Sequence, residues 1–375
     1  MIADVVIVGG GPAGSTAAYL LSGWGMRVLL LDKHRFPRPK LCGGLLTAKT
    51  SALVSRIFGV PSPELDRLSE HVAWGYGLYY RRRPILEDST EEPFRLVRRE
   101  VYDAFLLEKA REAGAEVLEG ERVVDLDPED PERMVIRTAK GRVLKARFIL
   151  GADGVKSLVR RRLGFSEKAA WRRGLALALE VSIPRRALPV AEPRVYLGYV
   201  RTGYAWAFPR KEDLLLGIGA LLSEAGGLSR AFGEFLSDLG IELRQGPRAH
   251  LIPFGNFLRR PARGRVLLAG DAAGLVEPLL GEGIFYAHRS GELAARALRL
   301  HLEQGHPLEE IYPFLLEQNI LPQLRQALKL RGFFFRRAHL LSRNPFRRIW
   351  HLLRRPCLDV VHGKRHYFLS RWMSF

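Results

Sequence analysis

The segment "DVVIVGGGPAGSTAAYLLSGWGMRVLLLDK", residues 4–33, decides the fold of this chain. An apolar run that ends at Gly9 predicts a strand buried on both faces. A helix of small residues is expected from Pro12 to Ser22, and a second apolar run predicts a strand that ends at Asp32. The segment therefore predicts a strand–turn–helix–strand unit of the Rossmann type.

Three glycines at the turn, Gly9, Gly11 and Gly14, form the pattern G-x-G-x-x-G. The first permits a tight turn, the second lets backbone approach a pyrophosphate, and the third lets the helix pack on the strand. The helix N-terminus then presents amides and a positive dipole to phosphate. Asp32, 18 residues after Gly14, is placed for a ribose hydroxyl. The alternative is a glycine-rich turn without a ligand, but the context favours a dinucleotide site.

Two later segments end predicted strands in a similar way. In "FILGADGVKSLVR", residues 148–160, Asp153 follows a strand directly. In "RVLLAGDAAGLVEPLLGEGI", residues 265–284, Asp271 follows another strand, and a glycine-rich stretch opens a helix. Either aspartate could instead be a turn or cap residue. Three such segments in register over some 280 residues nevertheless make a specific pattern.

The three segments, in this order, resemble those of the flavoprotein hydroxylase superfamily, whose FAD lies extended across the nucleotide domain. A carboxylate at a strand end can accept hydrogen bonds from ribityl hydroxyls. A glycine-rich helix start brings amides to the flavin edge that becomes anionic on reduction. The resemblance implies bound FAD and the following cofactor-binding residues: Gly9, Gly11, Pro12, Ala13, Gly14, Asp32, Lys33, Cys42, Gly43, Gly44, Arg99, Val123, Asp153, Gly154, Gly270, Asp271, Pro278, Gly281, Gly283 and Ile284.

Within that superfamily the chain is similar to the geranylgeranyl reductase family over roughly residues 1–300. The motifs that carry the similarity are "KLCGG" at 40–44, "VRREVYDAFLLEKAREAGAEV" at 97–117, "GYAWAFP" at 203–209 and "GDAAGLVEPLLGEGI" at 270–284. Gly274 stands where the hydroxylases usually have histidine. The resemblance implies saturation of isoprenoid C=C bonds by reduced flavin.

Four positions depart from the family pattern. Leu41 replaces a proline, Tyr102 replaces a phenylalanine, Arg201 stands where archaeal members often have proline, and Asp32 replaces the usual glutamate. The departure at Arg201 bears on the shape of the pocket. The shorter Asp32 side chain shortens the ribose contact without abolishing it.

The fold class expected is α/β (α+β overall), with a Rossmann-like FAD-binding domain, an inserted antiparallel-sheet substrate domain and a helical C-terminal tail. Alternating apolar runs between residues 174 and 221, separated by Pro, Gly and charged turns, indicate the antiparallel sheet. The predicted domains are 1–50, 95–165 and 262–305 for FAD, 51–94 and 166–261 for the substrate, and 306–375 for the basic helical region.

Three residues are the candidates for chemistry on a substrate: Cys42, Tyr204 and Trp206. The family resemblance would put Cys42 beside the flavin ring, where it could touch substrate, orient it or donate the proton that hydride transfer to a double bond requires. Water or Tyr204 could also donate that proton, and Cys42 could be a small buried filler. Tyr204, Trp206 and Phe208 alternate, so they share one strand face. They would form an aromatic wall for an isoprenoid chain, or else sheet core.

The composition sets bounds on partners. The 375 residues carry a formal charge of +19, which implies an anionic partner such as nucleic acid, anionic lipid or a phosphorylated molecule. Two distant cysteines make no disulfide framework, no signal peptide is recognisable, and no run of 18 apolar residues occurs. We expect a cytoplasmic monomer, peripheral on the inner face of the membrane if its tail binds lipid.

The tail carries the densest positive charge. Residues 331–375 hold eleven Lys and Arg against one acidic residue, interleaved with Phe, Trp and Leu. An interfacial helix on anionic lipid has this composition, as does a nucleic-acid surface or a solvated helical end. Cys357 is expected to be an ordinary buried cysteine.

The function expected is thus an FAD-dependent oxidoreductase that saturates C=C bonds of a geranylgeranyl-type chain. The alternatives are a flavin monooxygenase of an aromatic or polyene substrate and, from charge alone, a nucleic-acid-binding protein. We expect no nucleic-acid partner and no metal. The electron donor is expected to be NAD(P)H or a reduced ferredoxin-like protein. The sequence leaves the head group, the number of bonds reduced and the choice of donor open.

Overall fold

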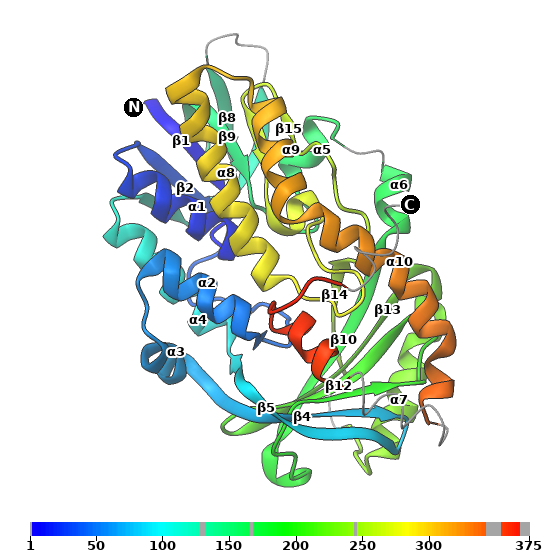
Figure 1. Cartoon of the computed structure of the whole chain (residues 1–375). Helices are drawn as coiled ribbons and strands as arrows, with labels where there is room; N and C mark the ends of the chain where they lie inside the picture. Colours follow the sequence, from blue (N-terminus) through cyan, green and yellow to red (C-terminus); the bar gives the residue numbers. More distant parts are fainter. Residues whose placement is uncertain (1, 128–132, 166–167, 244–245, 343–353, 368–375) are drawn as a thin grey trace.

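The computed structural model describes residues 2–127, 133–165, 168–243, 246–342 and 354–367. The chain forms two eight-stranded sheets, with helices over the first sheet and between the two (Figure 1). None of the helices in these ranges is long and apolar enough to cross a membrane.

The first sheet has a parallel centre in the order β16-β9-β1-β2-β6, with β15 at one edge and the antiparallel pair β7 and β8 beside β9. Its strands are β1 (Ile2–Val8), β2 (Val28–Asp32), β6 (Glu116–Glu119), β7 (Val123–Asp127), β8 (Met134–Thr138), β9 (Val143–Gly151), β15 (Ala262–Arg263) and β16 (Val266–Leu268). Within it, Val5 pairs with Val28 and Phe148, so segments far apart in the sequence form one core.

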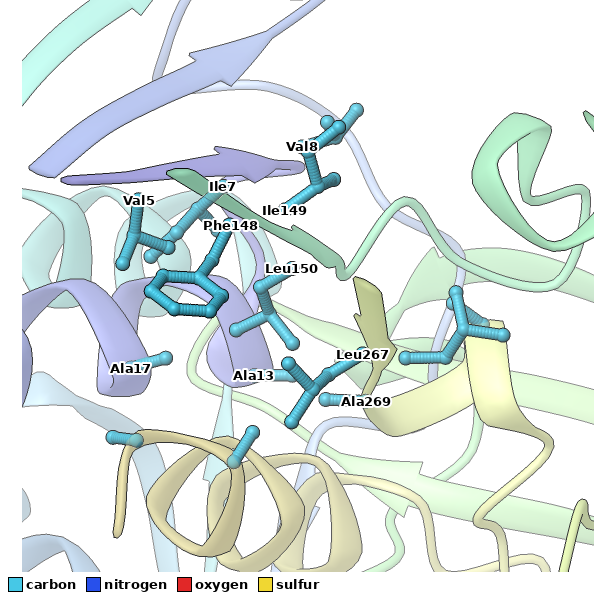
Figure 2. Packing of buried hydrophobic residues seen from close by; sticks show 14 of the residues in the cluster. Val5, Ile7, Val8, Ala13, Ala17, Phe148, Ile149, Leu150, Leu267 and Ala269 are labelled. Carbon is cyan, nitrogen blue, oxygen red and sulfur yellow. The ribbon is translucent and has the colours of Figure 1, made fainter. Parts of the chain in front are cut away.

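Three helices cover the parallel sheet: α1 (Pro12–Gly23), α4 (Arg99–Glu112) and α8 (Ile284–Gln304). Figure 2 shows Ala13 and Ala17 of α1 against Phe148 and Leu150 of β9. Small residues let α1 approach both the sheet and α8. A Cβ on Gly291 of α8 would lie 2.3 Å from the Ala13 carbonyl oxygen, so only glycine permits this helix crossing.

A buried histidine ties the three helices together. His288 of α8 shares hydrogen bonds with Thr16 Oγ1 of α1 (2.7 Å) and Tyr102 Oη of α4 (2.8 Å). Burial, followed by the nearby Arg99 cation, lowers the pKa of His288 to about 3. The ring is therefore neutral at pH 7, and its two nitrogens satisfy one donor and one acceptor role between the helices.

The second sheet has the order β14-β10-β13-β12-β11-β4-β5-β3. Its strands are β3 (Leu45–Leu46), β4 (Ser69–Tyr80), β5 (Arg83–Val97), β10 (Leu175–Pro184), β11 (Arg194–Leu197), β12 (Gly203–Pro209), β13 (Asp213–Leu221) and β14 (Arg248–Pro253). On one face, Ala205 and Ala207 pack with Phe232 and Phe235 of α7 (Leu228–Asp238). The opposite face, with Tyr204, Trp206 and Phe208, is turned to the interior cavity described below.

Residues 51–68, expected within the sheet domain, fold instead into most of α2 (Ala48–Phe58) and into α3 (Ser62–Leu68). Their apolar side chains join a cluster with Tyr102, Leu106 and Ile284 of the helices over the first sheet. Helical apolar spacing in this segment, rather than strand alternation, explains the difference. The exact domain boundaries stay a prediction.

The C-terminal region contains α9 (Leu308–Asn319), α10 (Leu321–Arg337) and a short helix at 354–361. The short helix, red in Figure 1, lies between the two sheets. It is followed by His362, whose ring accepts from the Ala48 amide and contacts Thr90 Oγ1. Part of the predicted lipid-binding tail, residues 343–353 and 368–375, lies outside the described residues.

The helix crossing predicts a test of packing. We expect Gly291→Ala to destabilise the protein by about 1–3 kcal/mol, because the new methyl group must push α8 away from α1. Thermal and denaturant unfolding followed by circular dichroism measure this change. Gly233→Ala in α7 is the matched control, since a Cβ there meets no atom within 4 Å and alanine favours the helix by up to about 1 kcal/mol. Equal effects of the two changes would contradict the packing argument.

Candidate active site

A cavity of about 1410 Å³ lies between the two sheets. The carboxyl ends of β1, β2, β9 and β16 open into it, which is where open parallel sheets bind ligands. Strands of the second sheet, α10 and the C-terminal helix contribute the rest of the lining.

The turn after β1 lines this cavity. Gly9 has φ +108°, and a Cβ there would lie 2.4 Å from the Ala152 carbonyl oxygen. A Cβ on Gly14 would lie 1.9 Å from the Gly9 carbonyl oxygen. Asp32 accepts hydrogen bonds from the amides of Gly10 and His34, both at 2.8 Å. The strand, turn and helix are thus locked in the geometry that presents free amides to a pyrophosphate.

Asp153 follows β9, and only one of its two carboxylate oxygens accepts hydrogen bonds from the described residues. Its Oδ2 accepts from the Leu158 amide at 2.6 Å and the Val159 amide at 3.3 Å. Its Oδ1 is buried without a hydrogen-bond partner among the described residues, and burial raises the pKa of this carboxyl. An unpaired buried acceptor beside the cavity suits a hydroxyl donor from a ligand.

Arg160, which the sequence motifs did not single out, joins the second and third cofactor segments. Its guanidinium donates to the Val155 carbonyl (3.0 Å) and to the Ala272 carbonyl (3.1 Å), and it lies 3.5 Å from the centre of the Trp171 ring. Burial lowers the pKa of Arg160 to about 10, so the side chain stays cationic at pH 7. It therefore holds the loops of Asp153 and Asp271 in register.

Hydrogen bonds fix the loop at 277–283, both within the loop and from residues of other elements. The buried Glu277 carboxylate accepts from the Leu279 and Leu280 amides and from the Tyr367 hydroxyl. Burial raises the pKa of Glu277. Tyr204 of β12 donates to the Leu280 carbonyl oxygen. The loop that opens α8 is thus fixed before a ligand binds.

The Cys42 segment is clamped by the second sheet. A Cβ on Gly43 would lie 2.7 Å from the Phe208 ring, and one on Gly44 would lie 2.1 Å from the Val97 carbonyl oxygen. The Arg99 guanidinium lies within hydrogen-bonding reach of the Cys42 thiol. Gly43 and Gly44 are therefore required, because a side chain at either position would clash with Phe208 or with the Val97 backbone.

Arg99 is itself fixed by α4. It makes a two-pronged ion pair with Asp103, at 2.7 and 2.8 Å, and Arg38 approaches the same carboxylate at 3.2 Å. Although burial opposes it, the Asp103 carboxylate raises the pKa of Arg99 above its usual range. Arg38 also lies beside the turn at Gly11, so the structure adds a cation to the phosphate-facing end that the motifs did not predict.

The aromatic face of β12 explains one of the two glycines in β13, Gly217. The Trp206 indole lies across Gly217, which is also its paired residue in the β12–β13 register. A Cβ on Gly217 would be 2.2 Å from the ring. Trp206 Nε1 is buried with no hydrogen-bond partner among the described residues. The stretch "LLLGIGALL", residues 214–222, therefore lies almost entirely in β13, where Gly217 makes room for the indole.

The structure brings nearly all predicted site residues to this cavity. Those that line it are Gly9, Gly11, Pro12, Ala13, Asp32, Lys33, Cys42, Gly43, Gly44, Arg99, Val123, Asp153, Gly154, Tyr204, Trp206, Gly270, Asp271, Gly281, Gly283 and Ile284. Gly14 and Pro278 are not in the lining; Gly14 acts through helix packing, as expected of the third glycine. The sequence reasoning missed Arg38, Lys40, Arg160, Glu180, His250 and Glu277, which sit outside the motifs or carry no spacing signal. The role of each residue stays a prediction.

Comparison with known proteins identifies the family. The FAD binding domain family matches residues 2–199. The chain belongs to this FAD-binding family. Among relatives, the menaquinone reductase of Mycolicibacterium smegmatis is 32% identical (79% of this chain, 76% of the relative). The geranylgeranyl diphosphate reductase of Rhodobacter capsulatus is 31% identical (82% and 77%).

Solved structures share the fold of this FAD-binding protein. A geranylgeranyl bacteriochlorophyll reductase-like protein from Thermoplasma acidophilum superposes with a TM-score of 0.77 at 22% identity (99% of this chain, 94% of that one). A probable FAD-dependent monooxygenase from Pseudomonas aeruginosa gives 0.71 at 21% identity (90% and 96%). The family match and the relatives make this chain an FAD-dependent oxidoreductase, and the shared fold confirms the predicted fold class.

The residues present fit FAD. The glycine turn and the N-terminus of α1 suit the diphosphate, and Asp32 retains acceptor capacity for a ribose hydroxyl. The free Asp153 oxygen and the Asp271 carboxylate lie along the same cavity toward the loop at 277–283. When bound, the flavin would supply two-electron redox chemistry to a substrate in this cavity.

We expect Asp271→Ala to weaken FAD binding by about 1.5–3 kcal/mol, since a charge-assisted hydrogen bond to a ribityl hydroxyl is lost. That corresponds to roughly a 10- to 150-fold rise in Kd. Equilibrium dialysis or flavin fluorescence on reconstituted apoprotein measures it. Glu303→Ala, in an exposed ion pair at the far end of α8, is the control. FAD retained equally by both variants would show that Asp271 does not bind the cofactor.

Proposed function

We propose that this protein saturates C=C bonds of an isoprenoid chain with electrons from reduced FAD. The observation that carries the proposal is that one cavity is shared by the predicted FAD-binding turn, Cys42 and an apolar end. That end is lined by Leu78, Leu86, Phe94, Val195, Leu197 and Phe333, among others. An apolar channel of this kind suits a long hydrocarbon substrate. The names of the two relatives, a menaquinone reductase and a geranylgeranyl diphosphate reductase, support the same substrate class.

Bound reduced FAD would supply the hydride to one carbon of the double bond. The other carbon needs a proton, and we propose Cys42 as the acid, since it belongs to a sequence motif and lines the cavity. Tyr204 is less suited to this role, because its hydroxyl donates to the Leu280 carbonyl and burial raises the pKa of the phenol. We propose instead that Tyr204 positions the loop at 277–283, and that Tyr204 and Trp206 form part of the cavity wall that contacts the isoprenoid substrate.

The second candidate function is flavin-dependent hydroxylation, because a probable FAD-dependent monooxygenase shares this fold. Gly274 does not decide between the two, because its backbone demands glycine: φ is +73° and a Cβ would lie 2.8 Å from the Asn256 carbonyl oxygen. The two reactions differ in their oxidant. Reduction of a prenyl chain proceeds without oxygen, whereas hydroxylation consumes it.

The experiment is anaerobic incubation of the chemically reduced holoenzyme with geranylgeranyl diphosphate, or with menaquinone, followed by mass spectrometry. A gain of two hydrogens per bond supports the proposal. Substrate that stays unchanged without oxygen but gains an oxygen atom in air would establish the monooxygenase instead.

We expect Cys42→Ala to retain FAD but to slow reoxidation of the reduced flavin by the prenyl substrate by about 10²–10⁴-fold, because an acid is lost. Cys42→Ser, which keeps a weak donor, should fall between. Anaerobic stopped-flow spectroscopy measures this step without the natural electron donor. Cys357→Ala controls for loss of the protein's other thiol. An unchanged rate in Cys42→Ala would make the residue a structural filler.

We also propose that the chain meets its substrate at an anionic membrane surface. Phe314 of α9 and Phe333 of α10 are 62% and 56% exposed, and the Arg337 cation lies 4.2 Å from the centre of the Phe333 ring. Phe333 also lines the cavity. An exposed aromatic residue beside cations at a cavity wall suits docking on lipid near the mouth of a lipid-binding channel.

Charge reversal tests this surface. We expect the double change Arg336→Glu and Arg337→Glu to weaken binding to vesicles of phosphatidylglycerol and phosphatidylcholine by about tenfold or more, since each basic residue at the surface adds about 1 kcal/mol. Vesicle sedimentation at two salt concentrations measures it. Reversal of the exposed Arg186 and Arg230 is the matched control. Equal loss in both double variants would mean that net charge, not this surface, drives binding.

A further inference from the structure

We propose that Lys40, held in place by His250, supplies the proton that restores the Cys42 thiol after each reduction. The inference rests on the proposed function and adds a positioning and proton-supplying pair to it. Lys40 lies two residues before Cys42, and His250 comes from β14 at the far edge of the second sheet. Both side chains line the cavity.

The pair is joined by a hydrogen bond between Lys40 Nζ and His250 Nε2. Charged groups face Lys40 from several elements. Asp271 approaches from the loop after β16, Arg99 and Asp103 from α4, and Glu180 from β10. The histidine is also faced by Arg99 and Lys156. Lys40 is thus placed among the cofactor carboxylate, the arginine that faces Cys42 and the second sheet.

The protonation states are set by burial and by these charges. Burial lowers the pKa of Lys40, with Asp271 opposing and Arg99 adding to the effect. Burial, then Lys40 and Arg99, lower the pKa of His250 to about 3, so its ring is neutral and Nε2 can accept from the ammonium. An ammonium whose pKa is lowered toward neutrality is a better proton donor than an ordinary lysine.

Cys42 and Lys40 lie close enough for their charges to interact, because a charged Cys42 is among the groups that raise the pKa of Lys40. Glu180 faces both residues from β10. Arg99 is the other cation near the thiol, but its raised pKa keeps its proton in place. Among the cations that face Cys42, Lys40 is therefore the one suited to give up a proton.

The transfer balances without any change of oxidation state. The two electrons come from reduced flavin, and the Cys42 S–H bond breaks as its proton moves to the substrate carbon. The resulting thiolate takes a proton from the Lys40 ammonium, and the Lys40 amine regains one from water in the cavity. His250 keeps the ammonium oriented and undergoes no net change.

Two substitutions at Lys40 separate charge from acidity. Lys40→Met removes both, whereas Lys40→Arg keeps the positive charge but holds its proton too tightly to give it up. With the holoenzyme under continuous chemical reduction and geranylgeranyl diphosphate as substrate, we expect the steady-state rate of both variants to fall at least about tenfold more than the rate of their first turnover. In the unsubstituted protein the steady-state rate should fall as pH rises through the pKa of Lys40. This limb of the pH profile should be missing in both variants. A Lys40→Arg protein with the full steady-state rate and pH profile would overturn the proposal.

Two substitutions of His250 test whether it positions Lys40. His250→Leu removes the acceptor of the Lys40 ammonium, and we expect its steady-state rate to fall as in Lys40→Met. His250→Gln keeps an acceptor oxygen and should fall between. Equal, full rates in both His250 variants would show that His250 does not position Lys40.

A readout without substrate keeps this inference separate from the proposed function. In oxidised protein, iodoacetamide should alkylate Cys42 more slowly at pH 8 in Lys40→Met than in Lys40→Arg, because the nearby cation favours the reactive thiolate. Peptide mass spectrometry measures alkylation, with Cys357 as the internal reference and FAD content as a check on folding. Equal alkylation would contradict the proximity of Lys40 to the thiol. If alkylation differs but no prenyl chain is reduced by the unsubstituted protein, the proposed function fails while the Lys40–Cys42 contact stands.

Discussion

The close approach of backbone to backbone around the first turn of α1 is the constraint on which the rest of the structure depends. The Gly14 Cα faces the Gly9 carbonyl, Gly9 faces Ala152, and Gly291 faces the Ala13 carbonyl, each at a distance that excludes a Cβ. These contacts join β1, β9, α1 and α8. Because these contacts are too close to allow movement, the three cofactor segments meet at one edge of the sheet in a defined geometry. The start of α1 then lines the cavity.

The second sheet completes the site through the aromatic residues of β12. Tyr204 holds the Leu280 carbonyl, Trp206 lies across Gly217, and Phe208 packs against Gly43. Each ring thus contacts a loop or strand beside the expected flavin position. A change in the second sheet is transmitted to the cofactor loops by direct contact, so substrate and cofactor ends of the cavity are built as one unit.

The cations of this strongly basic chain differ in what they do. Arg99 and Arg160 are held by a carboxylate or by carbonyl groups and fix loops. Arg354 pairs with Asp88, and Lys364 with Glu91 and Glu92, so part of the basic tail binds the β4–β5 hairpin rather than standing free. Lys40 differs from all of these, because its partner is a neutral ring. A net charge alone therefore says little about which cations meet an external partner.

The sequence by itself determined the strand–turn–helix unit, the glycines and carboxylates that follow its strands, and the shared face of Tyr204, Trp206 and Phe208. Glycine spacing and strand alternation are local signals, since a period of two or a turn geometry is set by neighbouring residues. These signals predicted a dinucleotide site, and the family resemblance of the motifs then predicted FAD and the residues that would line the cavity.

Only the tertiary structure decided which distant side chains meet there. His250 reaches Lys40 across 210 residues, Arg160 reaches Ala272 across 112, and Tyr367 reaches Glu277 across 90. The apolar side chains of residues 51–68 likewise find their partners on α4 and α8 only in the fold. Such pairs carry no periodicity, because burial and charge, rather than local backbone geometry, select them; the sequence can name the residues but not bring them together.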